Sequence, residues 1–153
     1  MVYDFHPLES VADLDNTSYR PCGGTALLDA LGTMINNVGE KLSAMSEEDR
    51  PSKVLFLVIT DGEENSSVVF SKEKIKEMVQ HQKDVYKREF VFMGANIDSM
   101  GEGMSMGFSQ QNTMDYTASP VGTRSLYKDI SKSTTRYRNN GASNSGGFFG
   151  KSK

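Results

Sequence analysis

A continuous apolar run over residues 54–60, "VLFLVIT", places the strongest constraint on what this chain can fold into. The run is short for a helix and rich in Val, Leu and Ile, which is typical of a parallel strand covered on both faces. It leads directly into Asp61 and Gly62. Because ligands of open parallel sheets bind outside the carboxyl ends of the strands, this run predicts a buried strand that carries a carboxylate to such an edge.

Helical and strand patterns alternate around this run. Apolar residues spaced by three and four predict a helix from Thr25 to about Met45 and a second helix with Ser71 as its N-cap. "EFVFMGANI" predicts a second buried strand, "SMGEGMSMGF" a weak helix, "QNTMDYTA" a short edge strand, and residues 121–138 a last helix. The side chains expected to face inward are Leu27, Leu31, Met34, Ile35, Val38, Leu42 and Met45 in the first helix, Ile75, Met78, Val79, Gln82, Val85 and Tyr86 in the second, and Leu126, Tyr127, Ile130, Thr134 and Tyr137 in the last.

This alternation predicts an α/β fold with a mostly parallel sheet flanked by helices. At 153 residues the chain is the length of a single domain, which we place at residues 1–138. "VYDFH", residues 2–6, alternates loosely and predicts a short edge strand that Pro7 ends. Residues 139–153 are rich in Gly, Ser and Asn, so we expect a disordered tail there.

Composition narrows the classes of partner and compartment. The net charge of −3 and a pI near 5.4 argue against a general binder of nucleic acid or of anionic membranes. The first ten residues lack a basic leader with an apolar core, and no run approaches the about 18 apolar residues of a membrane span. Cys22 is the only cysteine, so no internal disulfide can form and a reducing compartment is the simpler setting. We expect a cytoplasmic protein.

Two positions are candidates for binding a ligand. Asp61 followed by Gly62 suits a hard cation or a phosphate group, although an aspartate there can also cap its own turn. Thr25 follows two glycines at the start of a helix, where its hydroxyl could ligate Mg²⁺ or simply cap the helix. Asp29 fits a helix-dipole and surface residue better than a ligand. His6 and His81 have no second His or Cys at metal-ligand spacing, which argues against a zinc site.

Two segments in this order, "GGTALLDALG" and "VLFLVITDGEENSS", resemble a von Willebrand factor type A domain of the bacterial and phage single-domain kind. "EFVFMGANID" and "GTRSLYKDISKSTTRYR" resemble its later strand and closing helix, so the resemblance covers nearly everything from Val2 to about Arg138. It implies a doubly wound, Rossmann-like sheet with a metal-ion-dependent adhesion site. Thr25 and Asp61 match two of its metal-binding loops. The resemblance also implies Mg²⁺, with Mn²⁺ or Ca²⁺ as substitutes, and a module that binds a protein partner rather than an enzyme.

The chain departs from the family in one large respect. No Asp-x-Ser-x-Ser motif occurs in it, and matching "VYDFH" to the family's third strand leaves the first strand, first helix and second strand absent. The run at 54–60 would then have an unpaired apolar edge. Mg²⁺ would lack ligands and bind weakly or not at all, because it demands near-complete octahedral coordination. Another polypeptide could supply the missing strands, the chain could be a fragment, or it could self-associate.

Two alternatives lie outside this family. A phosphate-handling or phosphotransfer α/β enzyme could use Asp61 as nucleophile or Mg²⁺ ligand, with a second carboxylate from Glu63, Glu64 or Asp98. Such an enzyme normally needs a lysine near the same strand ends, and the sequence offers none that is well placed. The other alternative is a structural protein that binds no metal.

Overall fold

The structure, a computed structural model, describes residues 4–15, 17–18, 23–140 and 147–150. Within these residues three parallel strands form one open sheet in the order β1-β2-β3, and four α-helices accompany it, which confirms an α/β fold. The strands are β1 (Leu55–Thr60), β2 (Glu89–Gly94) and β3 (Thr113–Asp115). The helices are α1 (Leu27–Ala44), α2 (Lys72–Tyr86), α3 (Ser99–Ser105) and α4 (Pro120–Asn140), with short 3-10 helices at Leu8–Ser10 and Gln110–Asn112.

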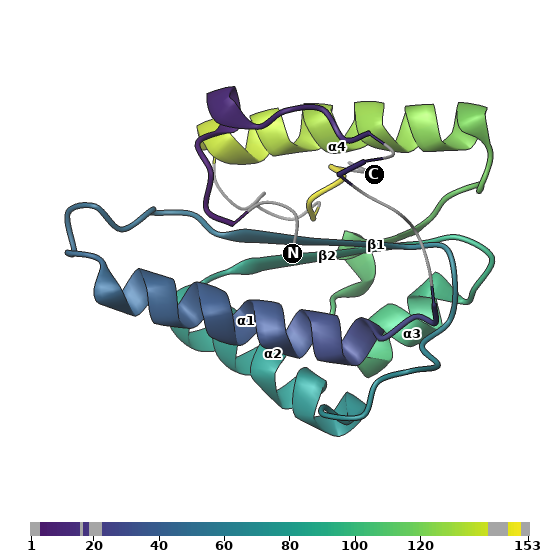
Figure 1. Cartoon of the computed structure of the whole chain (residues 1–153), viewed down its shortest axis with the longest axis horizontal. Helices are drawn as coiled ribbons and strands as arrows, with labels where there is room; N and C mark the ends of the chain where they lie inside the picture. The colour runs from purple at the N-terminus through teal and green to yellow at the C-terminus, as the bar shows by residue number, and fades with distance from the viewer. Residues whose placement is uncertain (1–3, 16, 19–22, 141–146, 151–153) are drawn as a thin grey trace.

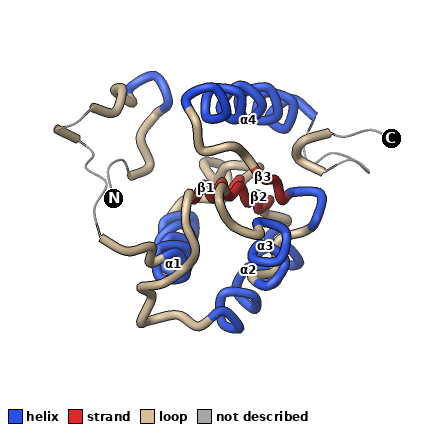
Figure 2. The backbone as a smooth tube through the Cα atoms, turned by 90° about the vertical axis from the view of Figure 1, so that its right-hand side faces the viewer, coloured by secondary structure: helices blue, strands red, loops and turns tan. Residues whose placement is uncertain are grey.

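Helices cover both faces of the sheet. β1 pairs with β2 from Leu55↔Glu89 to Thr60↔Gly94, and α2 makes the crossover between them. In Figure 1, α1 and α2 lie below the sheet and α4 lies above it, and Figure 2 shows the same layers end-on. This arrangement brings the carboxyl ends of the strands to one edge of the molecule, as the alternating pattern predicts.

The core beneath the sheet is aromatic in its centre. Phe56 of β1 and Phe90 of β2 stack with ring centroids 4.5 Å apart, and Phe108 meets Phe90 edge-on at 5.8 Å. The apolar stripes of α1 and α2 close over these rings, which explains the spacing of three and four in both helices. Ser71 caps α2 as expected, since its hydroxyl accepts a hydrogen bond from the Lys74 N–H at 3.2 Å.

The core above the sheet is smaller and is covered by α4. Its buried members from the sheet are Val91 and Met93 of β2, and its members from α4 include Leu126 and Tyr137. Successive β2 residues point to opposite faces, and both faces are covered, so five of the six residues of β2 are buried.

β1 is not covered on both faces, which corrects the expectation for residues 54–60. Leu57 and Ile59 face the α4 side and remain 37% and 38% exposed, whereas their register partners Val91 and Met93 are fully buried. Leu55 at the start of β1 packs against the core under α4, Leu57 and Ile59 remain partly exposed, and within the described residues no strand pairs with the outer edge of β1.

The expected strand over residues 2–6 is wrong for its described part. Asp4–His6 form a bend and coil, and Phe5 has a φ of +52°, which an extended strand cannot accommodate. Val2, Tyr3 and Cys22 lie outside the described residues. None of the described helices is long and apolar enough to cross a membrane.

Four of the expected inward-facing side chains are exposed instead. Val85 and Tyr86 occupy the last turn of α2, and Lys87 then ends the helix in a left-handed conformation. Met34 and Tyr127 lie at the borders of their helical stripes, while Ile35 and Leu126 beside them are buried. A spacing pattern predicts which residues lie at the centre of an apolar stripe more accurately than which residues lie at its borders.

Part of the expected disordered tail is packed. Gly147–Gly150 form a turn in which Phe148 is only 4% exposed and joins the core under α4. The Phe148 N–H donates to Oδ1 of buried Asn112 at 2.7 Å, and Nδ2 of Asn112 donates to the carbonyl of Phe90 at 3.1 Å. Asn112 thereby ties this turn to β2.

Candidate functional site

The loop that follows β1, residues 61–70, wraps around the start of α1. Two backbone segments far apart in sequence are joined there by reciprocal bonds. The Thr25 N–H donates to Oδ1 of Asn65 at 2.8 Å, and the Asn65 N–H donates to the Thr25 carbonyl at 3.0 Å. Gly24 permits this close approach, because a β-carbon on it would lie 1.9 Å from Oγ of Ser66. The loop therefore holds Thr25 in place.

Glu64 caps α1 from across the loop. Its carboxylate accepts from the Leu28 N–H at 2.9 Å, from the Ser66 and Ser67 N–H groups at 2.8 Å each, and from the Ser67 hydroxyl at 2.7 Å. Burial alone would raise the pKa of Glu64, but these hydrogen bonds outweigh it and lower the pKa to about 2. Glu64 is thus an ionised group committed to satisfying free N–H groups at a helix start.

Asp29 completes the contact in the opposite direction. Its carboxylate accepts from the N–H groups of Val68 at 2.8 Å, Val69 at 3.0 Å and Phe70 at 2.9 Å. Its own N–H donates to Oγ of Ser67 at 3.0 Å. The hydrogen bond from Val68, assisted by the other two, lowers the pKa of Asp29. Asp29 is an organiser of the loop, a role that the sequence interpretation as a surface residue did not include.

Thr25 lies beside the turn that follows β1. A β-carbon placed on Gly62 would be 3.4 Å from Oγ1 of Thr25, so the threonine hydroxyl lies on the side of Gly62 that a side chain would occupy. The N-cap position of α1 is Ala26, and it makes no side-chain cap bond. The helix start is satisfied by Glu64 and Ser67, so the interpretation of Thr25 as the N-cap residue is not what the structure has.

Asp61 borders a groove on the other side of this edge. The groove has a volume of about 570 Å³ and lies between Asp61, Tyr116, Ser119 and the first turns of α4, which include Arg124. Burial first, and then the negative charge of Asp61, raise the pKa of the Tyr116 hydroxyl. The structure thus places Thr25 and Asp61 at the same carboxyl edge, with Gly62 adjoining both.

The described residues do not fit a complete magnesium site. Mg²⁺ requires near-octahedral oxygen coordination, and Thr25 and Asp61 offer only one hydroxyl and one carboxylate. No group of three or more His, Cys, Asp or Glu side chains that could hold a metal occurs in the described part of the chain. Glu64, the acid that caps α1 at this edge, already accepts hydrogen bonds from four donors.

The acids that a phosphotransfer enzyme could recruit are largely engaged elsewhere. Glu64 caps α1, and Asp98 caps α3 by accepting from the Gly101 N–H at 2.9 Å. The groove beside Asp61 is lined by one cationic residue, Arg124, and by no lysine among the described residues. The site thus lacks the lysine that such an enzyme normally needs.

Sequence interpretation missed the structural role of the residues that build this edge. Asp29, Glu64, Asn65 and Ser67 form its hydrogen-bond network, and the only signal in the sequence was the cluster of acids, amide and hydroxyls in "EENSS". Local capping rules look three residues ahead, whereas these partners lie 36 to 41 residues away in sequence.

Comparison with known proteins adds no assignment: no family model, no curated protein and no solved structure matches this chain.

Proposed function

We propose that this chain is a non-enzymatic, von Willebrand factor A-type module that binds another protein, with Thr25 and Asp61 as remnants of a metal site. The observation that carries the proposal is the open, apolar outer side of β1 directly beside the edge that holds these two residues. Leu57 and Ile59 are more than a third exposed there. An apolar parallel strand that ends a sheet is normally paired or covered.

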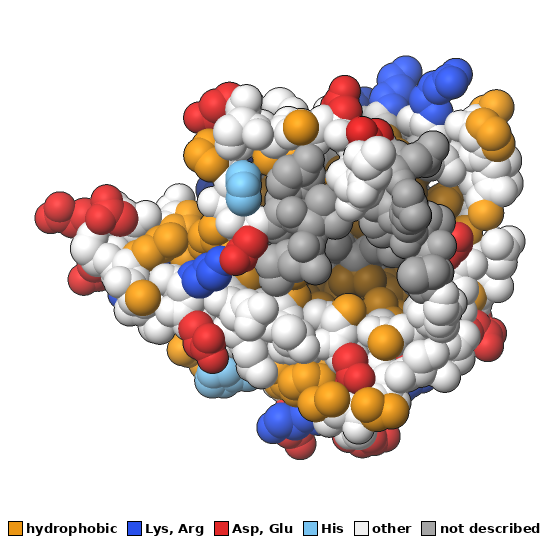
Figure 3. Space-filling view, in the orientation of Figure 1, with side chains coloured by type: hydrophobic (Ala, Val, Ile, Leu, Met, Phe, Trp, Pro, Cys, Tyr) orange, Lys and Arg blue, Asp and Glu red, His pale blue; other side chains and the backbone are white. Residues whose placement is uncertain are grey.

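The partner that fits this surface is a polypeptide that adds a strand to the outer edge of β1. Backbone N–H and C=O groups of an edge strand provide the hydrogen bonds, and Leu57 and Ile59 provide apolar contact. In Figure 3, hydrophobic side chains are visible in a recess above α1, the part of the molecule through which β1 runs in Figure 1. The same polypeptide could bring the metal ligands that the described residues lack.

The surface beside β1 can be tested by substitution. Self-association of the full chain, followed as light-scattering mass against concentration, is expected to fall sharply in Ile59→Lys, because a lysine removes apolar surface and discourages edge pairing. Val121→Lys alters an equally apolar but more exposed residue of α4 and is the matched control. If the wild-type chain is monomeric and Ile59→Lys has the same light-scattering mass, this surface does not bind a partner.

The metal site can be tested by calorimetric titration. Mg²⁺ and Mn²⁺ added to the full chain are expected to show no saturable binding tighter than millimolar, since Thr25 and Asp61 supply too few ligands. Asp61→Ala should then be indistinguishable from the wild type. Tight binding that Asp61→Ala abolishes would show that the chain completes its own site. Nucleotide turnover that is lost in Asp61→Ala would instead favour the phosphotransfer enzyme.

A further inference from the structure

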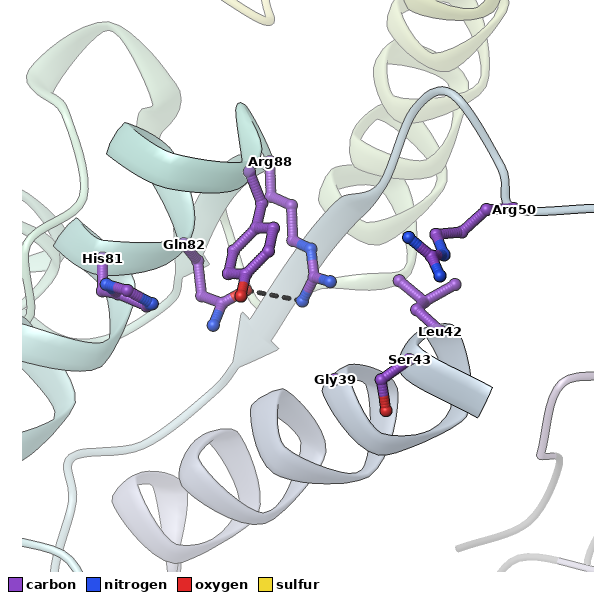
Figure 4. A pocket seen from close by; sticks show the side chains of 8 residues that line it. Gly39, Leu42, Ser43, Arg50, His81, Gln82 and Arg88 are labelled. Carbon is purple, nitrogen blue, oxygen red and sulfur yellow. Dashed lines mark hydrogen bonds between the residues drawn. The ribbon is translucent and has the colours of Figure 1, made fainter. Parts of the chain in front are cut away.

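A second pocket lies at the opposite end of the molecule from Thr25 and Asp61. It is formed where α1 and α2 end, and its volume is about 380 Å³. Figure 4 shows two guanidinium groups at this pocket: that of Arg88, which is directed toward Gln82, and that of Arg50, which extends toward the same space from the loop after α1. Leu42, His81, Gln82 and Tyr86 also line it, and none of its described lining residues is an Asp or Glu.

Arg88 is buried and fixed in place. The left-handed residue Lys87 turns the chain back after α2, so that the Arg88 N–H donates to the Gln82 carbonyl at 3.2 Å. The side chain then lies over the Tyr86 ring, with Cζ 4.8 Å from its centroid, and Nη1 donates to Oε1 of Gln82 at 2.5 Å. Only 8% of the residue is exposed. Burial lowers the pKa of its guanidinium, which is the sign of a cation deprived of water.

Among the described residues, neither arginine of this pocket has an acidic partner. Arg50 comes from the loop after α1, where its Nη2 donates to the carbonyl of Met45 at 3.0 Å. In the described part of the chain no ion pair includes Arg50 or Arg88. The two guanidinium groups carry a charge of +2. The C-terminal ends of α1 and α2 each contribute a partial charge of roughly −0.5, so the net charge around the pocket from these groups is about +1.

We propose that this pocket binds an oxyanion group, the phosphate or carboxylate of a small molecule, between Arg50 and Arg88. Guanidinium forks match both groups with paired hydrogen bonds, and a buried cation without a counter-ion is costly until such a group arrives. The pocket volume lies within the range of small-molecule sites. Leu42 and the Tyr86 ring offer apolar contact to the rest of the ligand.

The test is a titration of the full chain with inorganic phosphate, in which phosphate replaces chloride at constant ionic strength. The readout is the ¹H–¹⁵N signals of the arginine Nε–H groups, which report the binding site directly. We expect a saturable shift of the Arg88 signal. Arg50→Gln should weaken binding by about tenfold, because it removes one charge-assisted contact from an exposed position. Arg88→Lys should weaken it too, since it keeps the charge but loses the fork.

Lys128→Gln is the matched control, because it removes one positive charge from an exposed position of α4, on the other side of the sheet, and should leave phosphate binding unchanged. A parallel titration with citrate separates the two ligand sources: saturation by citrate alone assigns a carboxylate, and saturation by phosphate assigns a phosphate. Absence of a saturable shift with either anion would overturn the proposal. Equal weakening in Arg50→Gln and Lys128→Gln would overturn it as well, since that result would mean that the loss of any positive charge weakens binding.

Discussion

Replacing Phe148 by alanine is expected to lower the free energy of unfolding by about 3 kcal/mol, which denaturant unfolding would measure. The side chain is 4% exposed and packs among residues of β2 and α4, with the Tyr137 ring 6.5 Å away. Removing it leaves a cavity under α4 and deprives the Tyr137 ring of a packing contact. The effect is large because the core above the sheet contains few buried residues.

Phe149→Ala is the control for Phe148→Ala, since Phe149 is only partly buried and meets the Phe148 ring edge-on at 5.2 Å. Phe149→Ala should lower the free energy of unfolding by less than about 1.5 kcal/mol. A chain shortened to residues 1–146 should lose as much stability as Phe148→Ala does. If Phe148→Ala proves as mild as Phe149→Ala, the sequence-based expectation of a disordered tail holds for this segment.

The elements of the fold could be predicted because their signals are local. An apolar run gives β1 and β2, and spacings of three and four give α1, α2 and α4, without knowledge of what they contact. The same patterns place Thr25 and Asp61 at the ends of a helix and a strand, and parallel topology then brings both to one edge. The proposed von Willebrand factor A-type family rests on the sequence resemblance, and the proposed partner binding rests on the exposure of Leu57 and Ile59.

The remaining features depend on contacts between distant segments. The residues around Phe148 have the composition of a disordered tail, and only the surface offered by Asn112 and α4 orders it. Arg88 reads as an ordinary surface arginine after a helix, until the turn at Lys87 places it between two helix ends. Leu57 and Ile59 read as core residues, and their exposure follows from where α4 lies. No spacing rule contains this information.

Glu64 offers the clearest test of how the carboxyl edge is built. Replacing it by glutamine keeps the shape of the side chain but removes the charge and one acceptor oxygen. Four donors then compete for a single oxygen, so at least one N–H at the start of α1 or in the loop loses its partner. We expect a loss of about 2 kcal/mol in the free energy of unfolding, the scale of hydrogen bonds to a charged group. Glu63→Gln, at the exposed neighbouring position, should change it by less than about 0.5 kcal/mol.

The pH dependence of Glu64→Gln follows from the lowered pKa of Glu64. The folded value of about 2 lies below the ordinary value of 4.5, so the ionised carboxylate stabilises the fold fully above pH 4.5. That contribution is lost as the pH falls from 4.5 toward 2, because the unfolded chain takes up the proton first. Wild type and Glu64→Gln should therefore differ by a constant amount near neutral pH and converge in acid. A difference that stays constant down to the acid limit would show that the carboxylate charge does not hold the loop to α1.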